Sequence, residues 1–328
     1  MNFLPASQIA IDEPASFRLL EPRSLEEAAR LLAGESAVAL AGGCDVLERI
    51  KTQWIRPREV VNLKTIPGLS GVSGREIGAL ATLAAVARES RLPAALRQAA
   101  VRVATPQIRN LGTQGGNLLQ DSRCPYYRGP WHCYRAGGAT CDALRGFTYE
   151  HALWGGERCY TVSPSDTAPA LAALGAEVEV FGGGRLRRMP IERLFAPPSY
   201  DITSMHTLER GEILTRILLP EAPPGAGSAF RKAAARQSWD FALASAAVYV
   251  EMEGDRCRLA RVVLGAVAPV PWRAVEAEQA LLGARLRDRI EQAARAAVSG
   301  AQPLPHNAYK IGLVKRLVRE ALEEIAAG

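Results

Sequence analysis

A cysteine-rich segment in the middle of the chain constrains the fold more than any other feature. Cys124, Cys133, Cys141 and Cys159 are four of the six cysteines, and they lie within 36 residues of one another. The surrounding sequence shows no clear helical or strand period. In a reducing compartment, four clustered cysteines on a loop bind metal more often than they form disulfides. We therefore expect a fold that carries a metal-binding loop.

The spacing of these cysteines, C-x8-C-x7-C-x17-C, bears on which metal they bind. Thiolates are soft ligands whose usual partners are zinc and iron–sulfur clusters. Structural zinc sites favour cysteine pairs separated by about two to four residues, and this segment has none. Long, uneven spacings suit a bulkier [4Fe-4S] cluster. Zinc, disulfides and independent thiols stay open from the spacing alone, with His132 and His151 as conceivable further ligands.

Two glycine-rich stretches precede the cysteines. The apolar run AVALA ends in Gly42 and Gly43 and is followed by the helix-like DVLERIK, while IRNLGTQGGN contains Gly112, Gly115 and Gly116. Glycine permits positive φ and close approach of the backbone, so such stretches can bring N–H groups to a phosphate. One AGG alone is more often a tight strand-to-helix turn, but two stretches suit a diphosphate held from two sides. The GxGxxG fingerprint and the GxxxxGK[ST] loop are both absent from the sequence.

The remainder of the chain predicts two kinds of architecture. Up to residue 220, strands alternate with helices, including a helix that starts at Ser24, which indicates an α/β layer arrangement. A Pro/Gly stretch at 220–227 is the best domain boundary. Beyond it we expect a strand, an apolar helix-like stretch, two strands joined around EGDR, and a helical C-terminus. This second part reads as a compact α+β domain.

Composition excludes several classes of protein. No apolar run reaches the roughly 18 residues of a membrane span. The first residues, MNFLPASQIAIDEP, lack the pattern of a secretory signal, so we expect a cytoplasmic protein. The formal net charge of +6 comes from dispersed arginines, which does not favour nucleic-acid binding and is accounted for by an anionic cofactor or an acidic partner. No nucleophile–base pair is evident, so no catalytic residue is predicted.

Several motifs resemble one known family. AGGCDVLERIK (41–51), IRNLGTQGGNLLQ (108–120), PSDTAPALAALGA (164–176) and the C-terminal RxxLGAVAPVPWRAVEAEQALLG are similar to the FAD-binding subunit of molybdenum hydroxylases, the xanthine dehydrogenase and carbon monoxide dehydrogenase group. The resemblance spans roughly residues 15–325. It implies a two-lobed, PCMH-type FAD-binding domain at 1–220, with lobes at about 1–65 and 66–220 and an inserted iron–sulfur segment at 121–160. An α+β C-terminal domain with a small antiparallel sheet and helices would occupy 226–328.

The resemblance also assigns roles to individual residues. Backbone N–H groups would hold the FAD diphosphate in two loops, consisting of Ala41, Gly42, Gly43, Cys44, Asp45 and Val46, and of Gly112, Thr113, Gly115, Gly116 and Asn117. Asp166 would hydrogen-bond the ribityl or ribose hydroxyls, and Lys232 would lie near the isoalloxazine ring. The family loops usually read AGGTDL and TIGGN, so Cys44 replaces a threonine and Gln114 an isoleucine.

One branch of the family carries the cysteine segment. LLQDSRCPYY (118–127) and ERCYTVSPSD (157–166) are similar to the start and end of a loop that binds an extra [4Fe-4S] cluster. That loop occurs in the β subunit of 4-hydroxybenzoyl-CoA reductase and in the FAD subunit of bacterial aldehyde oxidoreductases. The resemblance implies Cys124, Cys133, Cys141 and Cys159 as its ligands.

The same resemblance implies a heterotrimer. A large molybdopterin-binding subunit would oxidise the substrate, an aldehyde or an aromatic or heterocyclic compound, and a small [2Fe-2S] subunit would exchange electrons with this chain. A partner with an export signal would carry the complex to the periplasm. Two rival hypotheses are a stand-alone FAD oxidoreductase with a structural zinc loop and a non-catalytic binding module. A third is a secreted chain with two disulfides.

Overall fold

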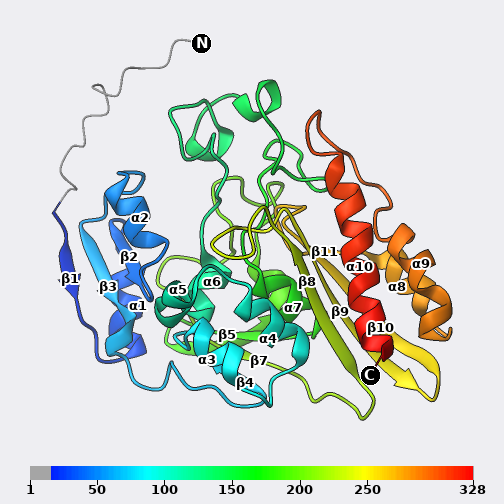
Figure 1. Cartoon of the computed structure of the whole chain (residues 1–328). Coiled ribbons are helices and arrows are strands. Elements are labelled where there is room, and N and C mark those ends of the chain that lie inside the picture. Colours follow the sequence, from blue (N-terminus) through cyan, green and yellow to red (C-terminus); the bar gives the residue numbers. More distant parts are fainter. Residues whose placement is uncertain (1–15, 328) are drawn as a thin grey trace.

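The computed structural model describes residues 16–327 (Figure 1). Residues 1–15, which include the N-terminal stretch discussed above and the start of the expected first lobe, lie outside the described residues. The first lobe contains β1 (Arg18–Leu20), α1 (Leu25–Leu32), β2 (Ala37–Leu40), α2 (Val46–Lys51) and β3 (Glu59–Asn62). Its parallel sheet has the order β1-β3-β2. Helix α1 begins where we predict, because the Ser24 side chain accepts a hydrogen bond from the N–H of Glu27.

The second lobe is built on an antiparallel sheet of order β4-β7-β5-β6. Its strands are β4 (Glu76–Gly78), β5 (Glu177–Gly182), β6 (Arg185–Pro190) and β7 (Ile213–Leu218). The accompanying helices are α3 (Leu83–Arg88), α4 (Ala94–Val101), α5 (Pro106–Leu111), α6 (Gln114–Leu119) and α7 (Thr167–Ala173). Strands and helices share one core that includes Ile77, Leu96 and Leu171.

The C-terminal part forms a second antiparallel sheet, of order β11-β10-β9-β8. It comprises β8 (Gly227–Ala233), β9 (Ala244–Glu253), β10 (Arg256–Gly265) and β11 (Trp272–Arg273), followed by α8 (Val275–Leu281), α9 (Leu286–Ala296) and α10 (Tyr309–Ala327). One sheet face packs on these three helices, and the other joins the core of the second lobe through Phe230 and Val263 (Figure 1). Because both faces are covered, the first eight residues of β9 are all buried.

The predicted fold class, an α/β part followed by an α+β part, is confirmed. Two local predictions are wrong. The glycine-rich stretch after residue 105, expected as a loop, forms the short helices α5 and α6. The apolar stretch after β8, expected to be helix-like, is a loop that ends where β9 begins at Ala244. The alanines that follow, Ala244, Ala246 and Ala247, are buried in β9, and this burial in the sheet overrides their helical propensity.

The cysteine segment, residues 121–160, lies between α6 and α7 and projects at the top of the view in Figure 1. Its regular structure consists of the 3-10 helices η3 (Tyr134–Ala136) and η4 (Asp142–Arg145). Within residues 16–327, no helix combines the length and the apolar character that crossing a membrane requires.

Candidate functional site

The two glycine-containing stretches meet between the lobes. A Cβ atom added at Gly42 would lie 2.2 Å from the carbonyl oxygen of Leu111 and 3.1 Å from Cα of Gly112. Only glycine permits this approach at position 42. The structure therefore brings residues 41–46 of the first lobe against residues 111–117 of the second lobe, as a ligand held from two sides requires.

The first of these stretches offers free hydrogen-bond donors. The backbone N–H groups of Gly42, Gly43, Cys44, Asp45 and Val46 make no hydrogen bond to any described residue. Gly43 has a φ of +79°, which turns the chain into α2. Consecutive free N–H groups at the start of a helix form a site for an anion. This stretch therefore has the chemistry that a phosphate needs.

The second stretch has most of its donors already in use. The N–H of Gln114 donates to Ala81 O at 2.8 Å, and that of Gly115 donates to Ala79 O at 2.8 Å. The N–H of Gly116 donates to Thr113 Oγ1 at 3.1 Å, and that of Asn117 donates to Thr113 O at 2.9 Å. The glycines of this stretch do not have positive φ. Gly115 instead lets α6 approach the sheet, because an added Cβ would lie 2.9 Å from Ala79. Thr113 keeps an N–H that bonds no described residue.

Buried side-chain hydrogen bonds join the start of α6 to the start of α7. Asn117 Oδ1 accepts from Ser165 Oγ at 2.6 Å and from Thr167 Oγ1 at 2.7 Å. Gln114 Nε2 donates to Thr167 Oγ1 at 2.8 Å, while its buried Oε1 atom has no partner among the described residues. An unpaired buried oxygen costs free energy unless a ligand or water bonds it.

Asp166 and Lys232, predicted to contact different parts of one ligand, contact each other. Lys232 Nζ lies 2.6 Å from Asp166 Oδ2 and also donates to Arg102 O at 3.1 Å and Asp240 O at 2.8 Å. The side chains are 2% and 6% exposed. Burial raises the pKa of Asp166, and the Lys232 charge opposes this. All three ammonium protons are used, so a direct bond from Lys232 to a ligand would require one of these bonds to break.

The four clustered cysteines come together as free thiols. Cys133 and Cys159 are buried, and Cys124 and Cys141 are partly exposed. Each lies near enough to at least one other for their charges to interact. Burial raises the pKa of Cys124 to about 11 and also raises the pKa values of Cys141 and Cys159. Within the described residues, no three His, Cys, Asp or Glu side chains are close enough to share one metal ion.

A group of ion pairs that the sequence analysis did not identify attaches the cysteine segment to the first lobe. Asp45 Oδ1 accepts from Arg123 at 2.7 Å and from Arg128 at 3.0 Å. Asp121 pairs with Arg135 at 2.8 Å and with Arg49 at 3.0 Å. The Asp45 carboxylate therefore faces these arginines, which leaves its backbone N–H as the group available to a ligand. The arginines are visible in the sequence, but no local pattern identifies partners more than 70 residues away.

The other end of the cysteine segment is attached to the C-terminal part of the chain. Asn307 Nδ2 donates to His151 O at 2.9 Å and to Ala152 O at 3.1 Å. Lys310 Nζ donates to the carbonyl oxygens of Glu150 and Ala266, both at 2.9 Å. We call Asn307 and Lys310 the C-terminal anchor. Lys310 is fully buried, and burial lowers its pKa to about 7.

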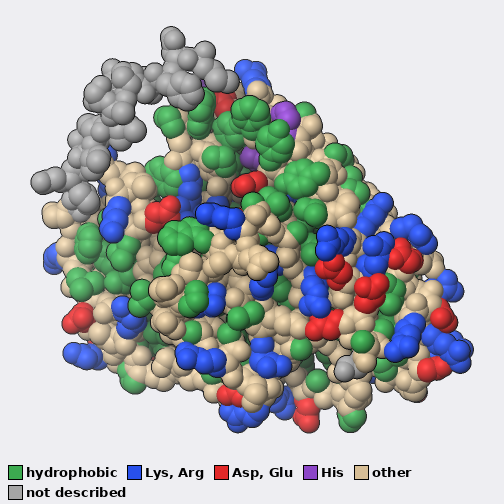
Figure 2. All heavy atoms as spheres, viewed as in Figure 1, with side chains coloured by type: hydrophobic (Ala, Val, Ile, Leu, Met, Phe, Trp, Pro, Cys, Tyr) green, Lys and Arg blue, Asp and Glu red, His purple; other side chains and the backbone are tan. Residues whose placement is uncertain are grey.

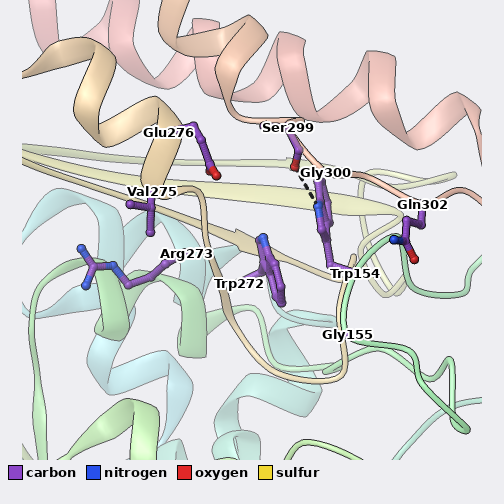
Figure 3. A pocket seen from close by; sticks show the side chains of 9 residues that line it. All are labelled: Trp154, Gly155, Trp272, Arg273, Val275, Glu276, Ser299, Gly300 and Gln302. Atoms are coloured by element: carbon purple, nitrogen blue, oxygen red, sulfur yellow. Dashed lines mark hydrogen bonds between the residues drawn. The ribbon is translucent and has the colours of Figure 1, made fainter.

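Trp154 extends this attachment (Figure 3). Its Nε1 donates to Ser299 O at 3.0 Å, and its ring stacks on Trp272 with ring centroids 5.8 Å apart. The two rings line a cavity of about 380 Å³ whose wall includes Arg273 and Glu276. The cavity contains none of the predicted site residues. The tryptophan pair attaches the end of the cysteine segment to the C-terminal part of the chain.

The cysteine segment also presents aromatic side chains to solvent. Phe147 is 62% exposed, Tyr149 53% and Trp131 55%. Phe147 and Tyr149 both pack against His306, with ring centroids 5.7 and 5.2 Å apart. Figure 2 shows hydrophobic and histidine side chains together over this part of the molecule. Exposed apolar patches of this kind mark surfaces that contact another molecule.

A second cavity, of about 290 Å³, connects the two predicted sites. Ser165 and Asp166 line one part of it, and Cys124 and His151 line another. Phe241 also borders the cavity, with the Arg123 guanidinium 5.0 Å from its ring centroid. The volume is at the lower end of ligand-binding pockets, so this cavity can accept a ring system rather than a whole dinucleotide. A ligand held here would contact both Asp166 and the cysteine cluster.

His151 lies at the junction of these features. Its Nε2 atom is 3.4 Å from Cys124 Sγ, and the side chain is buried. Burial and the charge of Lys310 lower the pKa of His151 to about 4, so the imidazole is neutral. His132 is exposed and pairs with Asp142 at 3.2 Å. Of the two histidines considered as further ligands, only His151 contacts one of the four cysteines.

Comparison with known proteins matches both parts of the chain. Residues 15–222 match the family described as FAD binding domain in molybdopterin dehydrogenase. Residues 228–325 match the family described as CO dehydrogenase flavoprotein C-terminal domain. The two matches together cover most of the sequence.

Individual relatives agree with these matches. The chain is 34% identical over 304 residues to the aldehyde oxidoreductase FAD-binding subunit PaoB of Escherichia coli, covering 88% of this chain and 91% of that protein. It is 30% identical to the carbon monoxide dehydrogenase medium chain of Afipia carboxidovorans, covering 96% and 98%. Among solved structures, it resembles a chain of reconstituted CO dehydrogenase from Oligotropha carboxidovorans with a TM-score of 0.74 and 27% identity, covering 96% and 99%.

Proposed function

The chain belongs to the family of FAD-binding subunits of molybdenum hydroxylases, and on this premise we propose that it carries both FAD and a [4Fe-4S] cluster. In this proposal it is the medium subunit of a heterotrimer. It moves electrons between the [2Fe-2S] clusters of a small partner and an external acceptor or donor. A large molybdopterin-binding partner oxidises the organic substrate, which we propose to be an aldehyde or an aromatic or heterocyclic compound.

The observation that carries this proposal is the cavity of about 290 Å³ lined by both Asp166 and Cys124. Asp166 belongs to the predicted FAD site and Cys124 to the predicted cluster site. Redox groups exchange electrons efficiently only when they are held close together, and positioning them is the part of the chemistry that the protein supplies. A chain that used its cysteines only for structure would not need them beside the flavin cavity.

The residues present fit FAD. The free N–H groups of Gly42 to Val46 and of Thr113 are donors for a diphosphate, and the side chain of Asp166 is an acceptor for hydroxyl groups. We propose these residues as the main contacts, with Gly112, Gly115, Gly116 and Asn117 shaping the second glycine-containing stretch. Lys232 acts through Asp166, whose carboxylate it orients. When bound, the flavin would supply two-electron chemistry and the cluster one-electron transfer.

The four cysteines fit a cluster better than a single zinc ion. Zinc holds each sulfur at about 2.3 Å, which draws four ligands into a tight tetrahedron. No three candidate ligands in the described part of the chain are that close, although the sulfurs interact electrostatically. We propose a [4Fe-4S] cluster here because its corners are reached by more widely separated sulfurs than a single ion allows. Burial raises the pKa values of Cys124, Cys141 and Cys159, so these thiols must release their protons to the solvent or to a base when metal binds.

Both the domain division and the partners are parts of the proposal. We assign residues 1–220 to the FAD-binding domain, 121–160 to its inserted cluster segment and 226–328 to the C-terminal domain. The exposed aromatic surface formed by Trp131, Phe147 and Tyr149 supports contact with a partner subunit. Two relatives are named as medium chains of carbon monoxide dehydrogenases. We propose a cytoplasmic complex, unless a partner carries an export signal.

Metal and flavin analysis of the chain purified without oxygen tests the proposal. We expect about four iron and four sulfide per chain together with one FAD. Cys133→Ser should lose the iron and keep the flavin, whereas Cys257→Ser, at a buried cysteine of β10 outside the cluster, should keep both. One zinc and no iron would instead support a stand-alone flavoprotein with a structural zinc loop. Absence of flavin would refute both.

A further inference from the structure

His151 contacts the cysteine cluster without belonging to it. Its Nε2 atom lies 3.4 Å from Cys124 Sγ, and only 4% of the residue is exposed. The Tyr126 ring packs against the imidazole with centroids 5.9 Å apart. This distance is within hydrogen-bond range for a ring nitrogen and a sulfur, and among residues 16–327 no three His, Cys, Asp or Glu side chains lie close enough to share one metal ion. The imidazole is therefore a neighbour of a proposed ligand.

The backbone around His151 is held from the C-terminal part of the chain. Asn307 Nδ2 donates to the His151 carbonyl at 2.9 Å, and Lys310 donates to the preceding carbonyl, that of Glu150, at 2.9 Å. Thr148 and His306 bond each other in both directions, by N–H of His306 to Thr148 Oγ1 and N–H of Thr148 to His306 Nδ1. These bonds fix where the imidazole lies along the cysteine segment.

The surroundings of the ring indicate which nitrogen carries the proton. His151 Nδ1 is buried and has no hydrogen-bond partner within the described residues. The carbonyl of Thr148 lies near enough to influence the ring but makes no hydrogen bond with Nδ1. A neutral imidazole has one N–H, and a metal-bound cysteine sulfur can only accept. The arrangement is satisfied when the proton is on Nε2 and points at Cys124.

We propose that His151 is a positioning residue for the cluster, with its Nε2–H donating a hydrogen bond to the Cys124 sulfur and the C-terminal anchor holding it in place. This inference rests on the proposed function, since it requires a cluster at the four cysteines. Hydrogen bonds to cluster sulfurs stabilise the reduced, more negative form and so raise the reduction potential. Cys124 and His151 line the same cavity as Asp166. The bond therefore acts on the side of the cluster that faces the proposed flavin.

The test compares two substitutions at one position in the FAD-loaded chain. His151→Phe keeps the ring shape and removes the donor, while His151→Gln keeps an N–H donor. We expect His151→Phe to shift the oxidised-to-reduced equilibrium of the cluster about tenfold, a potential about 59 mV more negative for a one-electron couple. His151→Gln should recover most of the shift. The flavin potential, recorded in the same electron paramagnetic resonance titration, should stay unchanged and serves as the internal reference.

A second measurement uses the unmodified chain and does not depend on how the variants fold. Nitrogen-15 histidine labelling should give a weak hyperfine coupling in the reduced cluster, and His151→Gln should remove it. A strong coupling typical of direct coordination would overturn the inference by making His151 a ligand. Absence of any histidine coupling, or equal potentials for His151→Phe and the unmodified chain, would overturn it too. A chain that binds no iron would instead refute the proposed function, before any substitution is made.

Discussion

Replacing Lys232 by Met tests how the two parts of the chain are held together. Lys232 lies in β8, and its ammonium group bonds Asp166 at the start of α7, Arg102 O after α4 and Asp240 O in the loop before β9. With side chains 2% and 6% exposed, Lys232 and Asp166 form a buried ion pair. Methionine fills a similar volume but leaves the carboxylate and two carbonyl groups without their donor.

The general energetics of buried ion pairs sets the scale of the effect. Removing one partner of such a pair costs about 3–5 kcal/mol, because the remaining charge stays buried without compensation. Replacing both partners by apolar residues is often neutral, so Lys232→Met combined with Asp166→Leu should recover most of the loss. The two substitutions should therefore be strongly non-additive in a double-mutant cycle.

Urea unfolding of the flavin-free chain, followed by tryptophan fluorescence, measures these differences. Arg236→Met is the matched control, because Arg236 pairs with Asp240 at the surface and surface pairs contribute little. A loss below about 1 kcal/mol for Lys232→Met, or simple additivity in the double variant, would contradict the reasoning.

The pH dependence of Lys232→Met gives an independent check. Burial raises the pKa of Asp166 in the folded chain above its usual value, and Lys232 opposes this effect. Without Lys232 the folded-state pKa rises further, so the folded chain binds a proton more readily than the unfolded chain. The stability of the variant should increase as the pH falls from 7 towards the unfolded pKa of about 4, relative to the unmodified chain. If the variant gains no stability at lower pH, Asp166 is not a buried, ionised carboxylate in the folded chain.

Three further substitutions test other contacts. Gly42→Ala should lower the FAD content at least tenfold, because the new Cβ would lie 2.2 Å from the carbonyl oxygen of Leu111. Gly71→Ala is the control and should leave the FAD content unchanged, because position 71 has open space around it. Gly115→Val should reduce the free energy of unfolding by about 1–3 kcal/mol even without flavin, since the side chain overlaps the sheet. The unmodified chain should gain stability between pH 7 and 10.5, because buried Lys310 has a pKa of about 7 and the folded chain therefore binds fewer protons than the unfolded chain in this range. Lys310→Met should abolish this gain, and equal pH profiles for the two proteins would contradict the reasoning.

Local sequence patterns predicted much of the fold. The Ser24 cap, the strand–glycine–helix turn at 37–51 and the helical C-terminus all depend on residues close in sequence, so their signals were readable. The same local reasoning was wrong for Gly115 and Gly116, which lie in the helix α6 rather than in a loop with positive φ. A glycine indicates that another group approaches the backbone closely. The local sequence does not say whether that group is a phosphate or a neighbouring segment of the chain.

The parts of the site that the sequence did not predict depend on distant partners. Lys232 and Asp166 were both identified as site residues, yet their mutual ion pair spans 66 positions. The arginines that bind Asp45 and the residues Asn307 and Lys310 that hold the cysteine segment lack any local pattern. Their roles follow from how the lobes pack, which periodicity and spacing do not encode.

The attachment of the cysteine segment to α10 has a consequence for biosynthesis. Cys159 is translated 151 residues before Lys310, an interval of about 8 to 30 s at ordinary ribosome speeds. During that interval the four cysteines exist without the anchor that sets their final geometry. In the proposed function, cluster insertion therefore follows translation of α10, and a chain truncated before α10 should bind no iron.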